Sequence, residues 1–409
     1  MPTIAVLGCF DTKGHELAFV AEIIRSLGVI PLLIDTGTTN RPQVDVDIRV
    51  TDILPAFSQP EDRGRCVSEI AAAVGPFVHR LATEGRLDGI ISLGGGGGTS
   101  IGTAAMRGLP LGIPKVMVST LASGNTAPYV GTSDIVMVPA IVDVAGLNRL
   151  SRSIFMAAAH AVCGMARARQ IAATSTAPDK PLIVASMFGN TTECVRIATQ
   201  DLEAAGYEVL VFHATGTGGR TMESLIGSGM VAGVLDITTT EIADELCGGV
   251  LSAGPTRLEA AGAAQVPAIV VPGCVDMVNF GPRESMPANL LDRTLYQHND
   301  QVTLMRTTPE ENRRIAEFIA EKLNAYPLPA TVLLPLKGVS VIAEAGGPFH
   351  DAEADHALFE TLQARLDPSI RVVAADHAIN DPAFAHLCAS ELIRLLNAGQ
   401  PQADASSAD

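Results

Sequence analysis

The chain has 409 residues, with 28 Lys and Arg against 44 Asp and Glu and a formal net charge of −16 at pH 7. A field of that sign repels polyanions over long range, so we expect no nucleic-acid partner and no binding to anionic membranes. Hydrophobic residues make up 47% of the chain and aromatic residues only 4%, so the cores are expected to be aliphatic. This length predicts two or three domains.

The cysteines and the N-terminus bear on the cellular compartment. The 7 cysteines are scattered and form no CxxC pair, a pattern typical of free thiols in a reducing environment. The first residues lack the basic start and long apolar core of a signal peptide. No segment reaches the roughly 20 apolar residues that a membrane span requires. We therefore expect a cytoplasmic protein.

The first half of the chain alternates short apolar runs with helical patterns. Buried strands are predicted at 4–7, 30–34, 87–93, 115–119 and 135–139. Helices are predicted at about 12–27, at 64–84, from Thr99 onward and at 145–173.

The alternation restarts after 174–180, a polar, Pro-containing segment that predicts a linker. Strands are predicted at 181–187, 207–213, 232–237, 268–272, 338–342 and 370–374. Helices are predicted at 191–205, 219–229, 241–248, 309–325, 352–366 and 382–397, with a loop at 273–300. Such alternation predicts parallel sheets with right-handed crossovers. The predicted fold is α/β, with two Rossmann-like doubly wound parallel-sheet domains, 1–177 and 178–409, and a cleft between them.

Ligands of such sheets bind beyond the carboxyl ends of the strands. The segments that follow the first-half strands are rich in Gly, Ser and Thr, and the sharpest is Gly94–Gly98, followed by Thr99 and Ser100. Five glycines are costly to order, but they leave backbone N–H groups open to a phosphate at a helix start. A flexible turn is the alternative. The segment lacks the Lys of a P-loop, and GCFDTKG is not GxGxxG.

Three charged residues follow the first two predicted strands, and two of them allow two interpretations. Asp11 can cap the first helix or hold Mg²⁺ beside phosphates. Lys13 can be a solvated surface charge or a cation beside the phosphate loop. Asp35 ends the second strand, where an acidic side chain holds ribose hydroxyls in dinucleotide folds.

Five segments carry a family resemblance: GCFDTKGHE (8–16), ISLGGGGGTS (91–100), VSTLASGNTAPYVGTSDI (118–135), PGCVDMVNFG (272–281) and HNDQVTLMRTT (298–308). Over essentially its whole length the chain resembles the family typified by the ATP-binding N-terminal region of the tomato protein that confers resistance to tomato mosaic virus. The resemblance implies two Rossmann-like subdomains, ATP with Mg²⁺ in the first, and a homodimer. The TIM-barrel-like domain of plant and fungal members is expected to be absent or separately encoded, and the antiviral role is not carried over.

The strand ends and the resemblance together give the predicted nucleotide site. It comprises Asp11, Thr12, Lys13, Asp35, Thr36, Gly94, Gly95, Gly96, Gly97, Gly98, Thr99, Thr120, Ala122, Ser123, Gly124, Asn125 and Asp134. Asp11 is the candidate metal ligand.

The second half also has hydroxyl-rich strand ends, which predict a site for a small substrate such as a carboxylate or a sugar acid. The catalytic candidates are His213, Asp236, Glu241 and Asp276, and the substrate-binding candidates are Asn190, Thr191, Arg257 and Arg306. The alternative for each is a structural role in a turn, a cap or the core. The spacing of His350, Asp351, Asp355 and His356 resembles a metal site, but a polar helix start is the favoured interpretation.

The predicted function is that of an ATP- and Mg-dependent enzyme, a phosphotransferase, ligase or hydrolase, acting on a small acid. A second hypothesis is a nucleotide-responsive binding or regulatory protein without turnover. A third is an enzyme that uses a nucleotide sugar or a dinucleotide.

Overall fold

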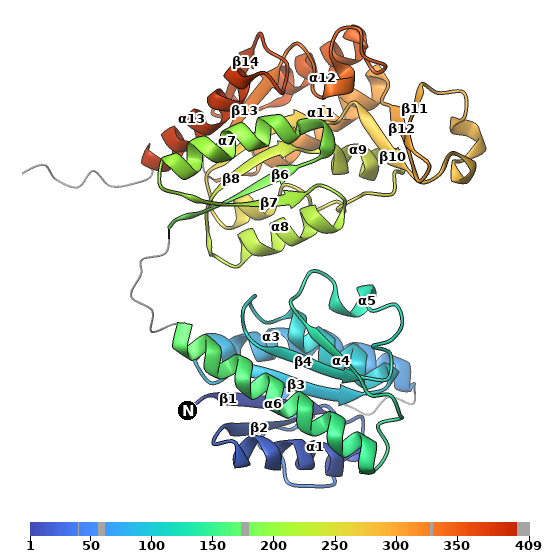
Figure 1. The fold of residues 1–409 in the computed structure, drawn as a ribbon, viewed down its shortest axis with the longest axis vertical. Coiled ribbons are helices and arrows are strands. Elements are labelled where there is room, and N and C mark those ends of the chain that lie inside the picture. The colour runs from blue at the N-terminus through green and yellow to red at the C-terminus, as the bar shows by residue number, and fades with distance from the viewer. Residues whose placement is uncertain (40, 56–61, 173–179, 328–329, 399–409) are drawn as a thin grey trace, which may run out of the picture. The chain divides into compact units, whose positions relative to one another are not determined.

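The structure is a computed structural model that describes residues 1–39, 41–55, 62–172, 180–327 and 330–398 (Figure 1). The chain divides into two compact units, Met1–Ala177 and Pro178–Asp409. The predicted linker at 174–180 lies, apart from Lys180, outside the described residues. No helix in the described ranges is long and apolar enough to cross a membrane.

Unit 1 contains a five-stranded parallel sheet in the order β2-β1-β3-β4-β5. Its strands are β1 (Thr3–Gly8), β2 (Ile30–Asp35), β3 (Gly89–Gly94), β4 (Lys115–Ser119) and β5 (Val136–Pro139). Its helices are α1 (Phe10–Ser26), α2 (Val50–Ile53), α3 (Arg63–Thr83), α4 (Gly96–Arg107), α5 (Ala127–Val130) and α6 (Arg149–Ala172).

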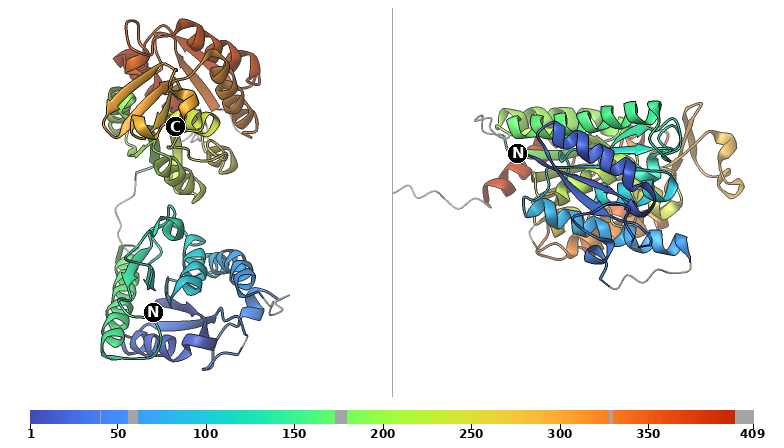
Figure 2. Two further views of the ribbon diagram at one scale, coloured as in Figure 1. Left: turned by 90° about the vertical axis from the view of Figure 1, so that its right-hand side faces the viewer. Right: turned by 90° about the horizontal axis from the view of Figure 1, so that it is seen from below.

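Helices cover both faces of this sheet. The apolar sides of α1 and α6 share one core with the strands, and α3 and α4 share the other (Figure 1). In the left view of Figure 2, α6 (green) and α3 (blue) lie on opposite sides of the sheet. Because both faces are covered, β3 is buried at every position, as expected for a central parallel strand.

The strand order fixes where a ligand can approach the sheet. From β1 the chain turns one way to β2 and later the other way to β3, so neighbouring crossovers diverge between β1 and β3. This divergence is the topological switch point at which open α/β sheets bind their ligands. The segments that follow β1 and β3 therefore frame the expected binding position of unit 1.

Unit 2 is built around a six-stranded parallel sheet in the order β14-β13-β9-β8-β6-β7. Its strands are β6 (Leu182–Met187), β7 (Glu208–His213), β8 (Val231–Thr238), β9 (Ala268–Gly273), β13 (Ala330–Pro335) and β14 (Arg371–Ala375). Helices α7 (Thr192–Ala204) and α13 (Pro382–Ala398) cover one face, and α9 (Thr240–Cys247), α11 (Pro309–Asn324) and α12 (Ala352–Arg365) pack into the core of the other. Helix α8 (Thr217–Gly227) packs on β6 and β7, and α10 (Ala260–Ala263) is a single turn.

The structure corrects the sequence prediction in two regions. The predicted loop at 273–300 contains most of a small antiparallel sheet, ordered β10-β12-β11 and formed by Met277–Phe280, Val302–Arg306 and Leu295–Asn299. The strand predicted at 338–342 is wrong, because β13 lies at 330–335 and residues 341–343 form a 3₁₀ turn. Two neighbouring apolar runs, each short enough for a strand, compete here, and periodicity cannot choose between them.

Candidate functional site

The glycine run joins β3 to α4 at the switch point. β3 ends at Gly94, Gly95 is the N-cap residue, and α4 begins at Gly96, three residues earlier than predicted. No side chain caps the helix. The first N–H groups of a helix have no partner within it, and the helix dipole adds partial positive charge there. The start of α4 can therefore accept an anion.

The structure gives different reasons for glycine at different positions of the run. None of them has a positive φ, so the backbone conformation alone requires glycine nowhere in the run. A Cβ on Gly94 would lie 2.7 Å from the Cα of Gly98, so packing requires that glycine. At Gly96, by contrast, a Cβ would meet no atom within 4 Å, and Gly96 and Gly97 are both exposed. Neither packing nor conformation explains the missing side chain at Gly96.

A hollow of about 320 Å³ adjoins the glycine run. It is lined by Ser119, Thr120, Ser123, Ile141, Val142 and Asp143. A Cβ on Gly95 would lie 3.7 Å from Oγ1 of Thr120, which places the hollow beside the start of α4. Thr120 and Ser123 are exposed, so their hydroxyls can reach a ligand.

The wall of this hollow contains a strained residue that sequence reasoning missed. Ile141 has φ 64°, it is 71% exposed, and the N–H of Val142 donates to the carbonyl of Ala140 across it at 2.7 Å. A β-branched residue at positive φ is an outlier, and such strain concentrates at functional sites. The sequence gives no signal for it, since isoleucine favours extended backbone.

Several predicted contacts of this region serve the fold instead. Thr99 is fully buried and its hydroxyl lies 2.7 Å from Oγ of Ser119, so this hydroxyl is engaged inside the fold. The N–H of Ala122 donates to the carbonyl of Ser119, and that of Gly124 to the carbonyl of Leu121. Asn125 accepts from the N–H of Ala127 at 3.2 Å. The last three contacts form tight turns after β4.

The residues that open α1 lie close to the second strand end. Asp11 does not cap the helix, because its Oδ2 accepts from the N–H and the hydroxyl of Thr39, each at 3.0 Å. Lys13 is partly buried and its Nζ donates to the carbonyl of Val144, which ties α1 to the segment after β5. Thr12 is exposed.

Asp35 and Thr36 are buried at the end of β2. Oδ1 of Asp35 accepts from the N–H of Phe10 at 3.0 Å and from that of Gly37 at 2.8 Å. Burial raises the pKa of the Asp35 carboxyl, although these hydrogen bonds oppose the shift. A carboxylate in this position holds the loops after β1 and β2 together and is not exposed to a ribose.

Asp134, which is predicted in the nucleotide site, pairs with a buried lysine. Its Oδ1 accepts from Nζ of Lys115 at 2.5 Å, and its Oδ2 accepts from the N–H of Gly112 at 2.8 Å. Lys115 begins β4, and Asp134 precedes β5, so both lie at the amino ends of the parallel strands. The ion pair neutralises a fully buried lysine at the edge opposite the glycine run.

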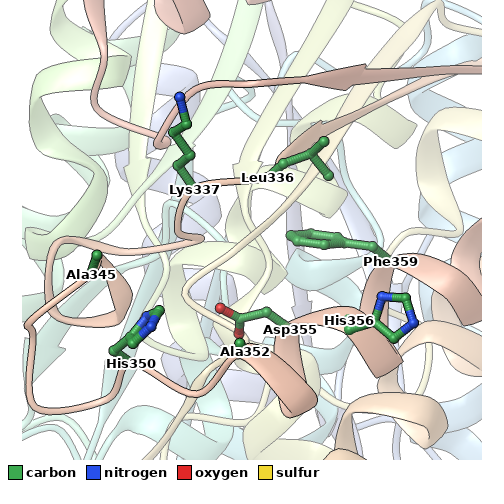
Figure 3. A pocket seen from close by; sticks show the side chains of 8 residues that line it. All are labelled: Leu336, Lys337, Ala345, His350, Ala352, Asp355, His356 and Phe359. Atoms are coloured by element: carbon green, nitrogen blue, oxygen red, sulfur yellow. The ribbon is translucent and has the colours of Figure 1, made fainter.

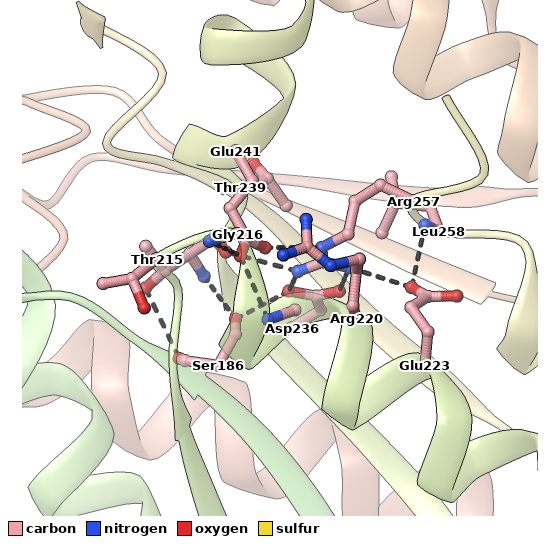
Figure 4. Close-up of polar contacts among 12 residues, drawn as sticks. Ser186, Thr215, Gly216, Arg220, Glu223, Asp236, Thr239, Glu241, Arg257 and Leu258 are labelled. Carbon is pink, nitrogen blue, oxygen red and sulfur yellow. Dashed lines mark hydrogen bonds and ion pairs between the residues drawn. The ribbon is translucent and has the colours of Figure 1, made fainter. Parts of the chain in front are cut away.

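In unit 2, three of the predicted site residues form one buried ionic network (Figure 4). Arg257 is 1% exposed and binds both oxygens of Asp236, at 2.5 and 2.8 Å. It also contacts Glu241 at 2.9 Å and Glu223 at 3.1 Å. All three side chains are buried and paired with one another, so the network accounts for them as core residues, and their predicted catalytic and substrate-binding roles stay predictions.

Arg306 and Asp276 are likewise internal. Arg306 donates to the carbonyl of Phe349 at 2.8 Å and to Asp355 at 2.6 Å. Asp276 is fully buried and accepts from the hydroxyl of Ser340 at 2.8 Å. Burial raises the pKa of Asp276 from 3.8 to about 6. Both side chains are engaged in contacts within unit 2, and their predicted substrate-binding and catalytic roles stay predictions.

The remaining second-unit candidates lie near the end of β6. Thr191 is buried, with its hydroxyl 2.7 Å from that of Thr238. Asn190 is half-buried and contacts the sulfur of Met277. His213 is exposed at the end of β7, and its ring packs edge-on against Phe188 with centroids 5.4 Å apart. The structure does not bring His213 together with the other predicted catalytic residues.

A hollow of about 480 Å³ lies at the carboxyl end of β13 (Figure 3). It is lined by Leu336, Lys337, Ala345, His350, Ala352, Asp355, His356 and Phe359. His350 and the Asp355 carboxyl point toward one another in Figure 3. Asp351 caps α12 by accepting from the N–H groups of Glu353 and Ala354, and the described residues contain no cluster of three metal-ligating side chains. The metal-like spacing is therefore a helix start.

Comparisons with known proteins cover both units. The description "Uncharacterised protein family (UPF0261) N-terminal domain" matches residues 2–171, and the C-terminal domain of the same family matches 180–396. A UPF0261 protein of Clostridium tetani is 48% identical over 96% of this chain and 98% of its own length. The ToMV resistance protein of tomato, Solanum lycopersicum, is 39% identical over 96% of this chain, which spans 56% of that protein.

A solved UDP-N-acetylglucosamine 2-epimerase from Rickettsia bellii matches 98% of this chain and 96% of its own, at 11% identity and a TM-score of 0.23. The family assignment rests on the sequence matches alone. Two findings support the family assignment. The two family descriptions together span both units, and one relative is 48% identical over 98% of its own length. The chain belongs to the family described as UPF0261.

Proposed function

We propose that unit 1 binds ATP, with the phosphates at the N-terminus of α4. The observation that carries the proposal is Gly96, an exposed glycine in the first turn of a helix where nothing in the protein excludes a side chain. Glycine in a helix costs roughly 0.5–1 kcal/mol relative to alanine. A ligand that approaches the backbone closely accounts for this cost.

The surroundings of the glycine run suit a nucleotide. Exposed backbone N–H groups at a helix start bind phosphate, and the run lies at the switch point of the sheet. The hydroxyls of Thr120 and Ser123 line the adjoining hollow. The family resemblance carried by GCFDTKGHE and ISLGGGGGTS points to ATP among the nucleotides.

Lys13 supplies the positive charge of the proposed site. Its ammonium group donates one hydrogen bond to the carbonyl of Val144 and has two further protons. The bond to Val144 fixes the side chain beside the loop after β5, so little side-chain entropy is lost when a phosphate binds.

The proposal also includes the type of reaction that the protein catalyses. We assign the protein to the ATP- and Mg-dependent enzymes, with a small carboxylate or sugar acid as the second substrate. In unit 2, the hollow lined by Lys337, His350 and Asp355 is an accessible candidate for this substrate, whereas Asp236, Glu241 and Arg257 are buried. Release of ADP in the presence of a panel of small acids tests this assignment. Stoichiometric ATP binding without ADP release would favour a regulatory binding protein.

A nucleotide panel in a thermal-shift assay tests the binding proposal. The full-length protein is heated with ATP, ADP, UDP-N-acetylglucosamine or NAD, each with and without Mg²⁺. A ligand at 100 times its Kd stabilises its target by about 2.7 kcal/mol. We expect ATP to raise the melting temperature most. A rise with UDP-N-acetylglucosamine or NAD and none with ATP would support the nucleotide-sugar or dinucleotide alternative.

A further inference from the structure

The segment that follows β5 carries a carboxylate into the wall of the hollow beside the glycine run. Asp143 is one of the residues that line this hollow, and it is exposed. Within the described ranges, no protein group donates a hydrogen bond to its carboxylate. Both oxygens of Asp143 can therefore accept hydrogen bonds from a ligand in the hollow.

Helix α1 holds the chain in place directly after Asp143. Nζ of Lys13 donates to the carbonyl of Val144, and Oε1 of Glu16 accepts from the N–H of Gly146. Glu16 is 5% exposed, so this contact is made inside the protein. The segment with Asp143 is therefore anchored to the body of unit 1, although its own side chain is exposed.

The chain is also held before Asp143, and there it is strained. The N–H of Ala140 donates to the carbonyl of Ser119 at 3.0 Å, and the N–H of Val142 donates to the carbonyl of Ala140 at 2.7 Å. Ile141 between them keeps φ 64° although it is 71% exposed. Such strain persists only where the surrounding structure imposes it, and it clusters where proteins clamp ligands. The conformation of this segment thus points to a ligand in the hollow.

The chemistry of the lining favours a neutral ligand with hydroxyl groups. None of the six residues that line the hollow is cationic, and Asp143 is an anion, so a phosphate is disfavoured there. A carboxylate only accepts hydrogen bonds, whereas the hydroxyls of Thr120 and Ser123 both donate and accept. Sugar hydroxyls match this combination of groups.

We propose that Asp143 binds the ribose of the nucleotide and accepts hydrogen bonds from its 2′- and 3′-hydroxyls. The inference rests on the proposed function for the position of the phosphates. Thr120 lines the hollow and also lies beside Gly95 at the start of α4, so phosphates bound there place the sugar near Asp143. Acidic side chains hold ribose hydroxyls in this way in dinucleotide folds. Asp143 takes the role that was expected of Asp35, which is buried.

Calorimetric titrations of the full-length protein with ATP, 2′-deoxy-ATP and 3′-deoxy-ATP, each with Mg²⁺, test the inference. In wild type, each missing hydroxyl should weaken binding by ~10-fold, because a hydrogen bond to a charged group is lost. Asp143→Ala should bind ATP ~10- to 100-fold more weakly and should bind all three nucleotides with equal affinity. Asp143→Asn keeps one acceptor oxygen and should lie between the two proteins. Because Asp143 is exposed, both variants should fold.

Glu22→Ala is the control, because it removes another exposed carboxylate of unit 1, on α1, and should leave all three affinities unchanged. Equal affinities of wild type for the three nucleotides would overturn the inference. So would an Asp143→Ala variant that still distinguishes ATP from its deoxy forms, since Asp143 would then contact only water.

The same titrations separate this inference from the ATP proposal. ATP binding that neither the ribose hydroxyls nor Asp143 affects would refute the ribose contact and leave the ATP site standing. Binding of UDP-N-acetylglucosamine or NAD in place of ATP, weakened by Asp143→Ala, would refute ATP as the ligand and keep the ribose contact. No nucleotide binding by wild type would refute both.

Discussion

At the residue scale, two acidic residues in similar sequence contexts have different positions and contacts in the structure. Asp11 and Asp134 both lie in motif segments beside a hydroxyl residue, Thr12 and Ser133 respectively. Asp11 opens α1 at the carboxyl edge of the sheet, whereas Asp134 pairs with the buried Lys115 at the amino edge. Whether a residue can contact a ligand therefore depends on the end of the strand at which it lies.

We expect Asp134→Ala to destabilise the protein by about 1–3 kcal/mol without changing its affinity for ATP. The change leaves a buried ammonium group whose remaining partners are the carbonyls of Pro110 and Ile113. Urea denaturation and ATP titration measure the two effects. Ser123→Ala, on the exposed rim, should show the opposite pattern. Weakened ATP binding by Asp134→Ala would return this residue to the site.

Asp276 should make the stability of unit 2 depend on pH. Its pKa of about 6 in the folded protein exceeds its usual 3.8, so folding favours the neutral form. This contribution is complete below about pH 4 and is lost as the pH rises to about 6, at a total cost of up to ~3 kcal/mol. Asp276→Asn can keep the bond from Ser340 and should lack this loss. Urea denaturation at pH 4 to 8 compares the two proteins, and parallel pH curves would contradict the assignment.

At the element scale, the Arg257 network joins separate pieces of unit 2. Asp236 lies on β8, Glu241 on α9 and Glu223 on α8, and all three converge on one guanidinium group. Glu241 also accepts from the N–H groups of Gly216 and Gly219 at the start of α8. The network sets how these elements pack, since Arg257 supplies the positive charge that pairs with all three carboxylates.

Arg257→Met should therefore destabilise unit 2 by about 3–5 kcal/mol, because it leaves buried carboxylates without their cationic partner. Arg220→Met is the matched control, because Arg220 is exposed and, among the described residues, its side chain donates to the carbonyl of Ser252 and the hydroxyl of Thr217. The control should cost less than about 1 kcal/mol. Equal costs in chemical denaturation would contradict the network's role.

The sequence predicted elements well where apolar periodicity was clear, and less well where polar side chains had to be placed. Strand β4 was predicted at its observed bounds, Lys115–Ser119, and the alternation of strands and helices gave the fold class. Burial of Asp236 and Arg257 was not predictable, because their partners lie up to 50 residues away in the chain. A strand-end acid that binds a ligand and one that binds a core arginine look the same in sequence.

At the scale of the whole molecule, the two units have separate hydrophobic cores. The clusters of unit 1 lie within residues 4–166 and those of unit 2 within 183–395, with no residue shared. Separate cores predict separate cooperative unfolding. We expect two transitions in calorimetry and a shift of only one of them when ATP is added. A single transition that moves as a whole would show that the units unfold together.

The central claim is that a phosphate of ATP binds at the start of α4. The ATP affinity and the stability of the Gly96→Ala variant test it most directly. Alanine is compatible with the open space at Gly96 and the helical backbone, so the free protein should gain up to ~1 kcal/mol of stability. Gly164→Ala in α6, another glycine with no atom near its Cβ position, should give a similar gain. Calorimetric titration with ATP and Mg²⁺ should show at least ~10-fold weaker binding for Gly96→Ala, about 1.4 kcal/mol, and wild-type binding for Gly164→Ala. Unchanged ATP affinity in Gly96→Ala would contradict a phosphate at the start of α4.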